Sequence, residues 1–91
     1  LSDNNLSDVN ELSTLGFLEE LYLSNNQISL ADPMGFLERL RILDLSDNDI
    51  DDISALNDLN NLEYLNISGN HVSDLQIAQF KRNNPDCVVV W

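Results

Sequence analysis

The chain has 91 residues, in which 16 acidic residues outnumber 4 basic residues and give a formal net charge of −12. This charge disfavours nucleic acid or an anionic membrane surface as a partner and leaves a cationic partner open. The sequence has no run of about 18 apolar residues for membrane insertion, and its single cysteine, Cys87, excludes an internal disulfide.

A period of 22 residues runs through the chain, marked by Asn4, Asn26, Asn48 and Asn70. Apolar residues keep fixed positions around each Asn; around Asn48 they are Leu40, Leu43, Leu45, Ile50, Ile53, Leu56 and Leu59. Because a repeated coil buries its core against its neighbours, we expect one domain over 1–91 with about four coils. These are a partial coil 1–17, full coils 18–39, 40–61 and 62–83, and a capping strand within 84–91.

The first copy of the repeat begins part-way through, because Leu1 has the same register as Leu23 and Leu45. An uncovered terminal coil would expose the edge formed by 1–18 to water. We therefore expect upstream repeats or a cap in a longer parent protein.

Each copy contains a Leu-x-Leu segment that alternates apolar and polar residues, as a short strand with one buried face does. The pattern predicts strands at 20–24, 42–46, 64–68 and 86–90. Successive strands joined by crossovers must be parallel, so they are expected to form one sheet on the inside of a curve. The return limbs, such as 54–62, are short and polar, which predicts turns or 3₁₀ segments on the convex side.

The repeated Asn follows each predicted strand at the point where the chain turns. Its amide can both donate and accept hydrogen bonds to backbone groups that the turn leaves unpaired. Stacked copies should form an Asn ladder, which gives these four residues a structural role.

Cys87 has the register of Leu21, Leu43 and Leu65, and is therefore expected to be a buried thiol.

Two return limbs depart from the pattern. In the second coil, the segment from Leu30 to Met34 replaces the usual limb and predicts a local bulge. In the last coil, Ser73 and Asp74 are N-cap candidates, and the basic Lys81 and Arg82 are followed by Pro85. These signals predict a helix over 75–83. The repeat register continues through Leu75 and Ala78 and then breaks at Lys81 and Asn84, where earlier copies have Leu.

The motif L-x-x-L-x-L-x-x-N-x-I occurs at 18–28 and 40–50, and with Val as its last residue at 62–72. It is similar to the leucine-rich-repeat consensus, and the limb from Asp52 to Leu59 resembles the internalin and phosphatase-regulator variant. The stretch from Phe80 to Trp91 resembles the ending of bacterial members, which favours a secreted or cell-surface setting. The resemblance implies an α/β solenoid: a parallel sheet on the concave face, 3₁₀ or turn segments on the convex face, and a C-terminal helix and strand as cap.

The concave sheet is the usual binding surface in this family, and residues that alternate with the buried leucines should face it. They are Glu20, Tyr22, Ser24, Ile42, Asp44, Ser46, Tyr64, Asn66 and Ser68. Exposed aromatic side chains on a rigid sheet supply contact area for a partner, although tyrosine also simply suits a strand. We identify Glu20, Tyr22, Ile42, Asp44, Tyr64 and Asn66 as candidate partner-binding residues.

An acidic loop follows the strand of the third coil, and Asp47-x-Asp49-x-Asp51 in it mimics the start of a calcium loop. The sixth position, however, holds Asp52 where such a loop needs Gly, and Asp58 replaces the expected Glu. We therefore assign no metal and favour an acidic surface for a Lys/Arg-rich partner, with Asp47 and Asp49 as candidate contacts.

The sequence offers little for catalysis. His71 is the only histidine, it follows a ladder Asn, and no motif pairs it with Ser or Cys. We therefore expect a module that binds another protein, with no cofactor and no enzymatic activity. An alternative is a C-terminal closing segment of a longer array, which burial of Val88, Val90 and Trp91 by their own chain would favour; their exposure would instead invite strand addition.

Overall fold

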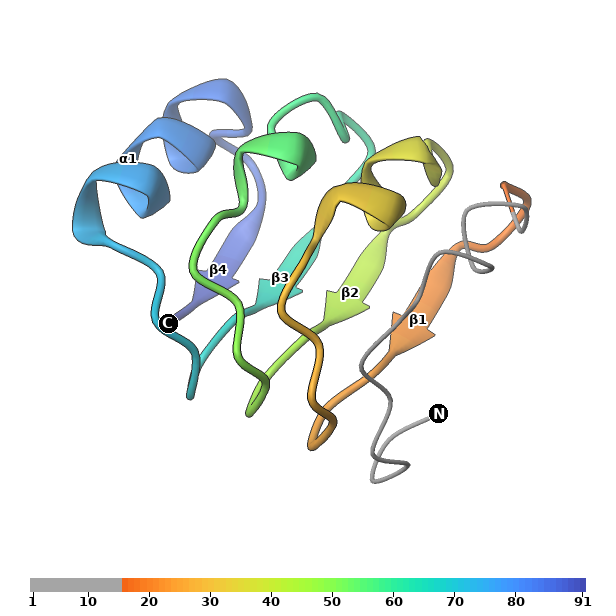
Figure 1. The fold of residues 1–91 in the computed structure, drawn as a ribbon. Helices are drawn as coiled ribbons and strands as arrows, with labels where there is room; N and C mark the ends of the chain where they lie inside the picture. The colour runs from red at the N-terminus through yellow and green to blue at the C-terminus, as the bar shows by residue number, and fades with distance from the viewer. Residues whose placement is uncertain (1–15) are drawn as a thin grey trace.

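The computed structural model describes residues 16–91, in which four three-residue strands form one parallel sheet (Figure 1). The predicted partial coil, with Leu1 and Asn4, lies outside the described residues apart from its end. The strands pair in the order β1-β2-β3-β4. They are β1 (Glu20–Tyr22), β2 (Ile42–Asp44), β3 (Tyr64–Asn66) and β4 (Val88–Val90).

The strands are shorter than the predicted segments, but backbone pairing continues beyond them. Leu23 and Leu45 donate their backbone N–H groups to the carbonyls of Asp44 and Asn66, each at 2.8 Å. Further on, the N–H of Asn25 reaches the carbonyl of Ser46 at 3.0 Å. The coils are therefore held together from the strand into the following turn.

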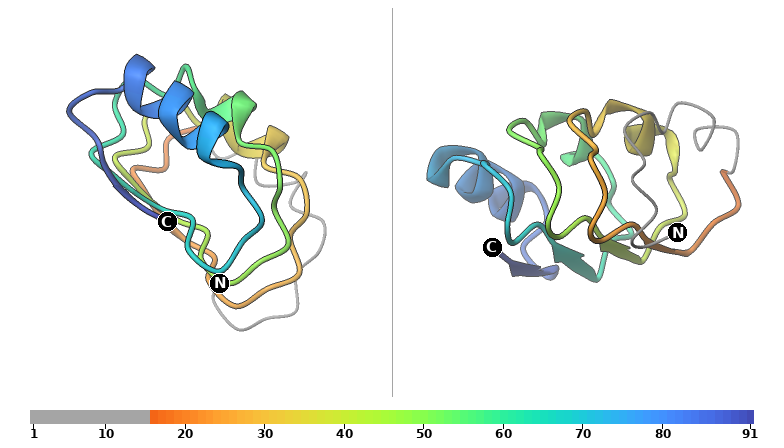
Figure 2. Two further views of the ribbon diagram at one scale, coloured as in Figure 1. Left: turned by 90° about the vertical axis from the view of Figure 1, so that its left-hand side faces the viewer. Right: turned by 60° about the horizontal axis from the view of Figure 1, so that its bottom comes forward.

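The return limbs lie on the other side of the core from the sheet, as Figure 2 shows in two views. They contain the 3₁₀ helices η2 (Asp32–Phe36) and η3 (Ser54–Leu56) and the helix α1 (Asp74–Asn83). Where a bulge was predicted, the second coil has the longer 3₁₀ helix η2, with Pro33 in its first turn. Helix α1 begins one residue before the predicted start, and the Ser73 side chain caps it by accepting the N–H of Gln76 at 3.3 Å.

The core lies between these layers and consists mainly of the repeated apolar residues. Leu75 and Ala78 keep the repeat register but are exposed, Leu75 by 68%. Ile77 and Phe80 are buried instead, because an α-helix brings residues three apart to one face, whatever the period of the coils.

The last coil is also longer than the repeat predicts. Leu21 pairs with Leu43 and Leu43 with Leu65, but Leu65 pairs with Val89. Cys87 therefore does not take the strand position expected for it, although its side chain is buried as predicted. An α-helix rises about 1.5 Å per residue and a 3₁₀ helix about 2.0 Å, so the limb with α1 needs more residues. A slip of two residues keeps the same faces buried.

The predicted Asn ladder is confirmed for Asn48 and Asn70, and Asn26 donates in the same way to the carbonyl of Leu23 in its own coil at 2.9 Å. Asn48 donates through Nδ2 to the carbonyls of Leu45, in its own coil, and Leu23, in the preceding coil, at 2.9 and 3.0 Å. Its Oδ1 accepts the backbone N–H of Ile28 at 3.1 Å. Asn70 repeats these bonds one coil further along. The amides of Asn48 and Asn70 thus each join two coils.

Asn84 is a buried polar residue at a position where the earlier coils have leucine. It has the register of Leu18, Leu40 and Leu62 but is buried as an amide, with 7% of its surface exposed. Its Nδ2 donates to the carbonyl of Asn57 in the preceding coil at 3.0 Å and to that of Phe80 at 3.2 Å. The polar residue is accommodated because the end of α1 supplies an acceptor.

Candidate partner-binding surface

The concave face of the sheet presents two rows of side chains across the coils. The strand register sets both rows. The first row is Glu20, Ile42, Tyr64 and Val88, and the second is Tyr22, Asp44, Asn66 and Val90. All eight are at least partly exposed, whereas the residues between them, such as Leu43 and Leu65, are buried. The structure therefore brings the six predicted sheet residues together and adds two valines.

The β1 end of this face is polar and negatively charged. The Tyr22 hydroxyl donates to Glu20 Oε1 at 3.0 Å, and 46% of the tyrosine surface is exposed. This hydrogen bond raises the pKa of Tyr22, helped by desolvation and by the charges of Glu20 and Asp44. Tyr22 thus remains a neutral hydrogen-bond donor beside carboxylates at physiological pH.

Asp44 and Asn66 also have a structural role that the alternation pattern did not predict. Asp44 Oδ1 accepts the N–H of Ser46 at 3.0 Å and its hydroxyl at 2.7 Å. Asn66 makes the same two bonds to Ser68. Ser46, predicted to face outward, is buried with 8% exposure, and Ser68 is half-buried. The Asp-x-Ser and Asn-x-Ser spacings are typical of such local turns and could have signalled them.

The acidic loop lies beyond β2 and is separate from the two rows. Asp47 and Asp49 are exposed, and Asp47 has a left-handed backbone with φ of 57°. Further along, Asp52 Oδ1 accepts the N–H of Ser54 at 2.8 Å at the start of η3, and this bond lowers the pKa of Asp52. Over residues 16–91, no three His, Cys, Asp or Glu side chains converge as metal ligands do.

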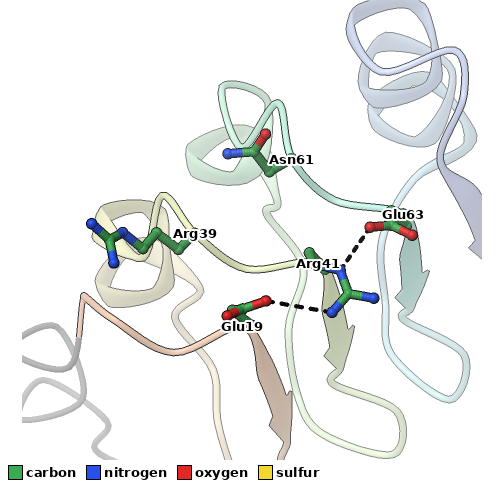
Figure 3. A pocket seen from close by; sticks show the side chains of 5 residues that line it. All are labelled: Glu19, Arg39, Arg41, Asn61 and Glu63. Atoms are coloured by element: carbon green, nitrogen blue, oxygen red, sulfur yellow. Dashed lines mark hydrogen bonds and ion pairs between the residues drawn. The ribbon is translucent and has the colours of Figure 1, made fainter.

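The sequence prediction missed an ion-pair cluster next to the strands. Arg41 lies between Glu19 and Glu63, the residues one period before and after it, with Nη1 and Nε at 3.4 and 2.8 Å from their carboxylates (Figure 3). These bonds raise the pKa of Arg41, most strongly through Glu63. The common spacing of 22 residues was a readable signal for the cluster.

Family models match most of the described chain. The model "Leucine Rich Repeat" matches residues 17–37, and "Leucine Rich repeats (2 copies)" matches residues 38–79. The chain belongs to the leucine-rich-repeat family. Its parallel sheet, 3₁₀ segments and C-terminal helix are those of a leucine-rich-repeat solenoid.

Solved structures place it near the internalins. An internalin (inlF) of Listeria monocytogenes is 29% identical with a TM-score of 0.84, over 91% of this chain and 24% of its own. An internalin C2 from the same species is 30% identical with a TM-score of 0.81, over 93% and 36%. A leucine-rich-repeat protein of Leptospira interrogans is 28% identical with a TM-score of 0.79, over 93% and 22%. A search of curated proteins gives no match.

This internalin-like chain spans between about a fifth and two fifths of the lengths of these proteins. Leucine-rich-repeat proteins generally mediate protein–protein interaction and are typically not enzymes. In the described part of the chain no helix is both long enough and apolar enough to cross a membrane. His71 is exposed, and its backbone N–H donates to the carbonyl of Ile50 at 2.8 Å.

Proposed function

We propose that this leucine-rich-repeat chain recognises another protein through its concave face. The contacts are made by Glu20, Tyr22, Ile42, Asp44, Tyr64 and Asn66. The observation that carries the proposal is the arrangement of these side chains in two adjacent rows on a rigid sheet, with Tyr22 46% exposed. A tyrosine held in place by a neighbouring carboxylate gives a partner a large contact at little entropic cost.

The proposed partner has a basic surface. Glu20 and Asp44 flank Tyr22, and the exposed Asp47 and Asp49 extend the negative charge beyond the sheet. Long-range attraction of this kind mainly accelerates association and weakens with added salt. The partner's affinity should therefore fall when NaCl is raised from low to high concentration, and an affinity indifferent to salt would contradict the basic-partner assignment.

Photo-crosslinking tests the face itself. Partners are isolated from a displayed protein library, and a photoreactive phenylalanine analogue is placed at position 20 on the concave face or at position 58 on the convex side. Crosslinking is expected from position 20 only. A double variant, Tyr22→Ser with Tyr64→Ser, should stay folded and lose capture. Normal capture by this folded variant would falsify the proposal.

A second candidate function is closure of a longer array by the C-terminal segment. Buried Phe80 and Asn84 favour it, because they join α1 to the preceding coil. Val88 and Trp91, 59% and 60% exposed, favour an open edge. If Val88 and Trp91 close the core, Val88→Thr with Trp91→Ser should clearly lower the stability of the chain; unchanged stability would show that these two side chains form an open edge.

A further inference from the structure

A hollow of about 310 Å³ lies outside the concave face, on the edge where the chain enters the strands. Glu19, Arg39, Arg41, Asn61 and Glu63 line it (Figure 3). Glu19, Arg41 and Glu63 directly precede β1, β2 and β3. The hollow therefore spans three coils on the side of the solenoid where the chain runs from the return limbs into the strands.

The charge of this hollow differs from that of the chain as a whole. The chain has 4 basic residues and a net charge of −12, yet two of the four, Arg39 and Arg41, line the hollow with two glutamates. The lining is therefore electrically balanced. Glu19 and Glu63 are both paired with Arg41, so Arg39 is the charge in this lining that an approaching anionic group can pair with directly.

Arg39 is available to such a group. Over residues 16–91 it takes part in no salt bridge, and Figure 3 shows its guanidinium directed away from Arg41 and from both glutamates. Arg41 is held in place by its bonds to Glu19 and Glu63 through Nη1 and Nε, which leaves Nη2 outside these two ion pairs. A guanidinium fixed by neighbours loses less entropy when it binds a further carboxylate.

Two exposed phenylalanines, Phe17 and Phe36, lie close to Arg39 in sequence or in repeat position. Phe36, 70% exposed, ends η2 three residues before Arg39, which limits their separation to about 11 Å. Phe17, 66% exposed, precedes Glu19 as Arg39 precedes Arg41. The N–H of Arg41 bonds the carbonyl of Glu19 at 2.7 Å, and Phe17 and Arg39 take the same repeat position, two residues earlier, in these adjacent coils.

The next coil lacks these features, because Asp58 and Asn61 stand where the second coil has Phe36 and Arg39. The departure of the second coil from the repeat thus replaces polar or acidic positions with an aromatic ring and a cation. Aromatic residues and arginine are the types most enriched at the energetic centres of protein interfaces. Single exposed apolar residues are common on protein surfaces, but two phenylalanines near an arginine outside any salt bridge match the composition of protein interfaces.

We propose that Phe17, Phe36, Arg39 and Arg41 form a second docking surface, the arginine–phenylalanine surface, for an acidic protein segment. The segment presents a carboxylate side chain beside an aromatic or branched aliphatic one. The carboxylate binds the guanidinium of Arg39 and Nη2 of Arg41, and the neighbouring apolar side chain covers Phe17 or Phe36. Through Arg39 this surface takes a carboxylate, whereas the concave face is proposed to take cationic groups, so one partner can bind each.

NMR titration of the 91-residue chain at about 0.15 M salt tests the proposal, with N-acetyl-Glu-Phe-amide as the probe. Shift changes are expected at the Nε–H groups of Arg39 and Arg41 and at the rings of Phe17 and Phe36. The matched probe N-acetyl-Gln-Phe-amide should bind about threefold more weakly or worse, as loss of one exposed ion pair implies. N-acetyl-Lys-Phe-amide should not perturb the two arginines.

Variants separate this surface from general attraction of anions. Arg39→Gln should abolish the preference for the Glu probe over the Gln probe and keep the backbone spectrum. Arg82→Gln, which removes an exposed cation on α1, should leave that preference unchanged. Equal binding of the Glu and Gln probes, shift changes centred on α1, or an unaltered preference in the folded Arg39→Gln protein would each overturn the proposal.

Discussion

Three residues that directly precede the ladder asparagines have left-handed backbone conformations. They are Asn25, Asp47 and Gly69, with φ of 59°, 57° and 71°. Asn, Asp and Gly are the residues that tolerate this region at least cost. The turn after each strand therefore selects the residue before the Asn as well as the Asn itself.

Gly69→Ala should lower the free energy of unfolding by about 1–3 kcal/mol. An alanine at position 69 would keep the left-handed backbone, which strains a residue with a Cβ. Its Cβ would also collide with the Asp47 carboxylate, which packs against the glycine. Asn25→Gly is the matched control at the same repeat position, and it should change stability little or raise it. Urea unfolding measures both, and a Gly69→Ala protein as stable as the parent would contradict the account.

Asp52 gives a prediction of pH dependence. Its pKa is lowered, first by the N–H of Ser54, so its contribution to stability is present above the ordinary aspartate pKa. The contribution is lost as the pH falls through the lower folded pKa. Urea midpoints of the parent and Asp52→Ala should therefore differ by a constant amount near neutral pH and converge in strong acid. A difference that grows on acidification has the wrong sign.

At the scale of the residue, the period predicted the ladder because its bonds depend only on the position of Asn after a strand. It did not predict the burial of Ser46, since alternation along a strand takes no account of the hydroxyl's bond to Asp44. Asp44 shapes its turn through this bond, and its place in the strand register directs it to the concave side.

Helix α1 is the element that departs most from the repeat, and it decides which apolar residues of the last coil are buried. Phe80 is fully buried, whereas Leu75, which keeps the repeat register, is 68% exposed. Phe80→Ala should cost about 3–5 kcal/mol. Leu75→Ala is a control on the same helix and should change stability by about 0.5 kcal/mol or less. Similar costs for the two substitutions would contradict the burial of Phe80 and the exposure of Leu75 on this helix.

The elements were predictable where the coils repeat and less so where they do not. The 22-residue period located β1, β2 and β3 and the short limbs, but extrapolation beyond α1 placed the last strand two residues early. The length of a crossover depends on the rise per residue of its helix type, which a register count does not contain. The Arg41 cluster was missed for another reason, because Glu19 and Glu63 lie just outside the strands, where alternation gives no signal.

The whole molecule carries far more negative charge than its ion pairs neutralise. Among residues 16–91 the salt bridges are those of Arg41, whose partners Glu19 and Glu63 have side chains 61% and 63% exposed. Exposed pairs contribute about 0–1 kcal/mol, whereas the net charge of −12 opposes the compact state through self-repulsion over the entire surface.

Salt should therefore raise the stability of this protein, the opposite direction from its effect on the proposed binding of a basic partner. Screening at 0.5 M NaCl reduces the repulsion among the many carboxylates more than it reduces the attraction at Arg41. Tm at 0.02 and 0.5 M NaCl measures the effect, with Arg41→Met as the matched variant, which should show a slightly larger rise because it has no ion pairs to lose. A Tm that falls with salt in the parent protein but not in Arg41→Met would mean that the Arg41 cluster, rather than the overall charge, governs stability.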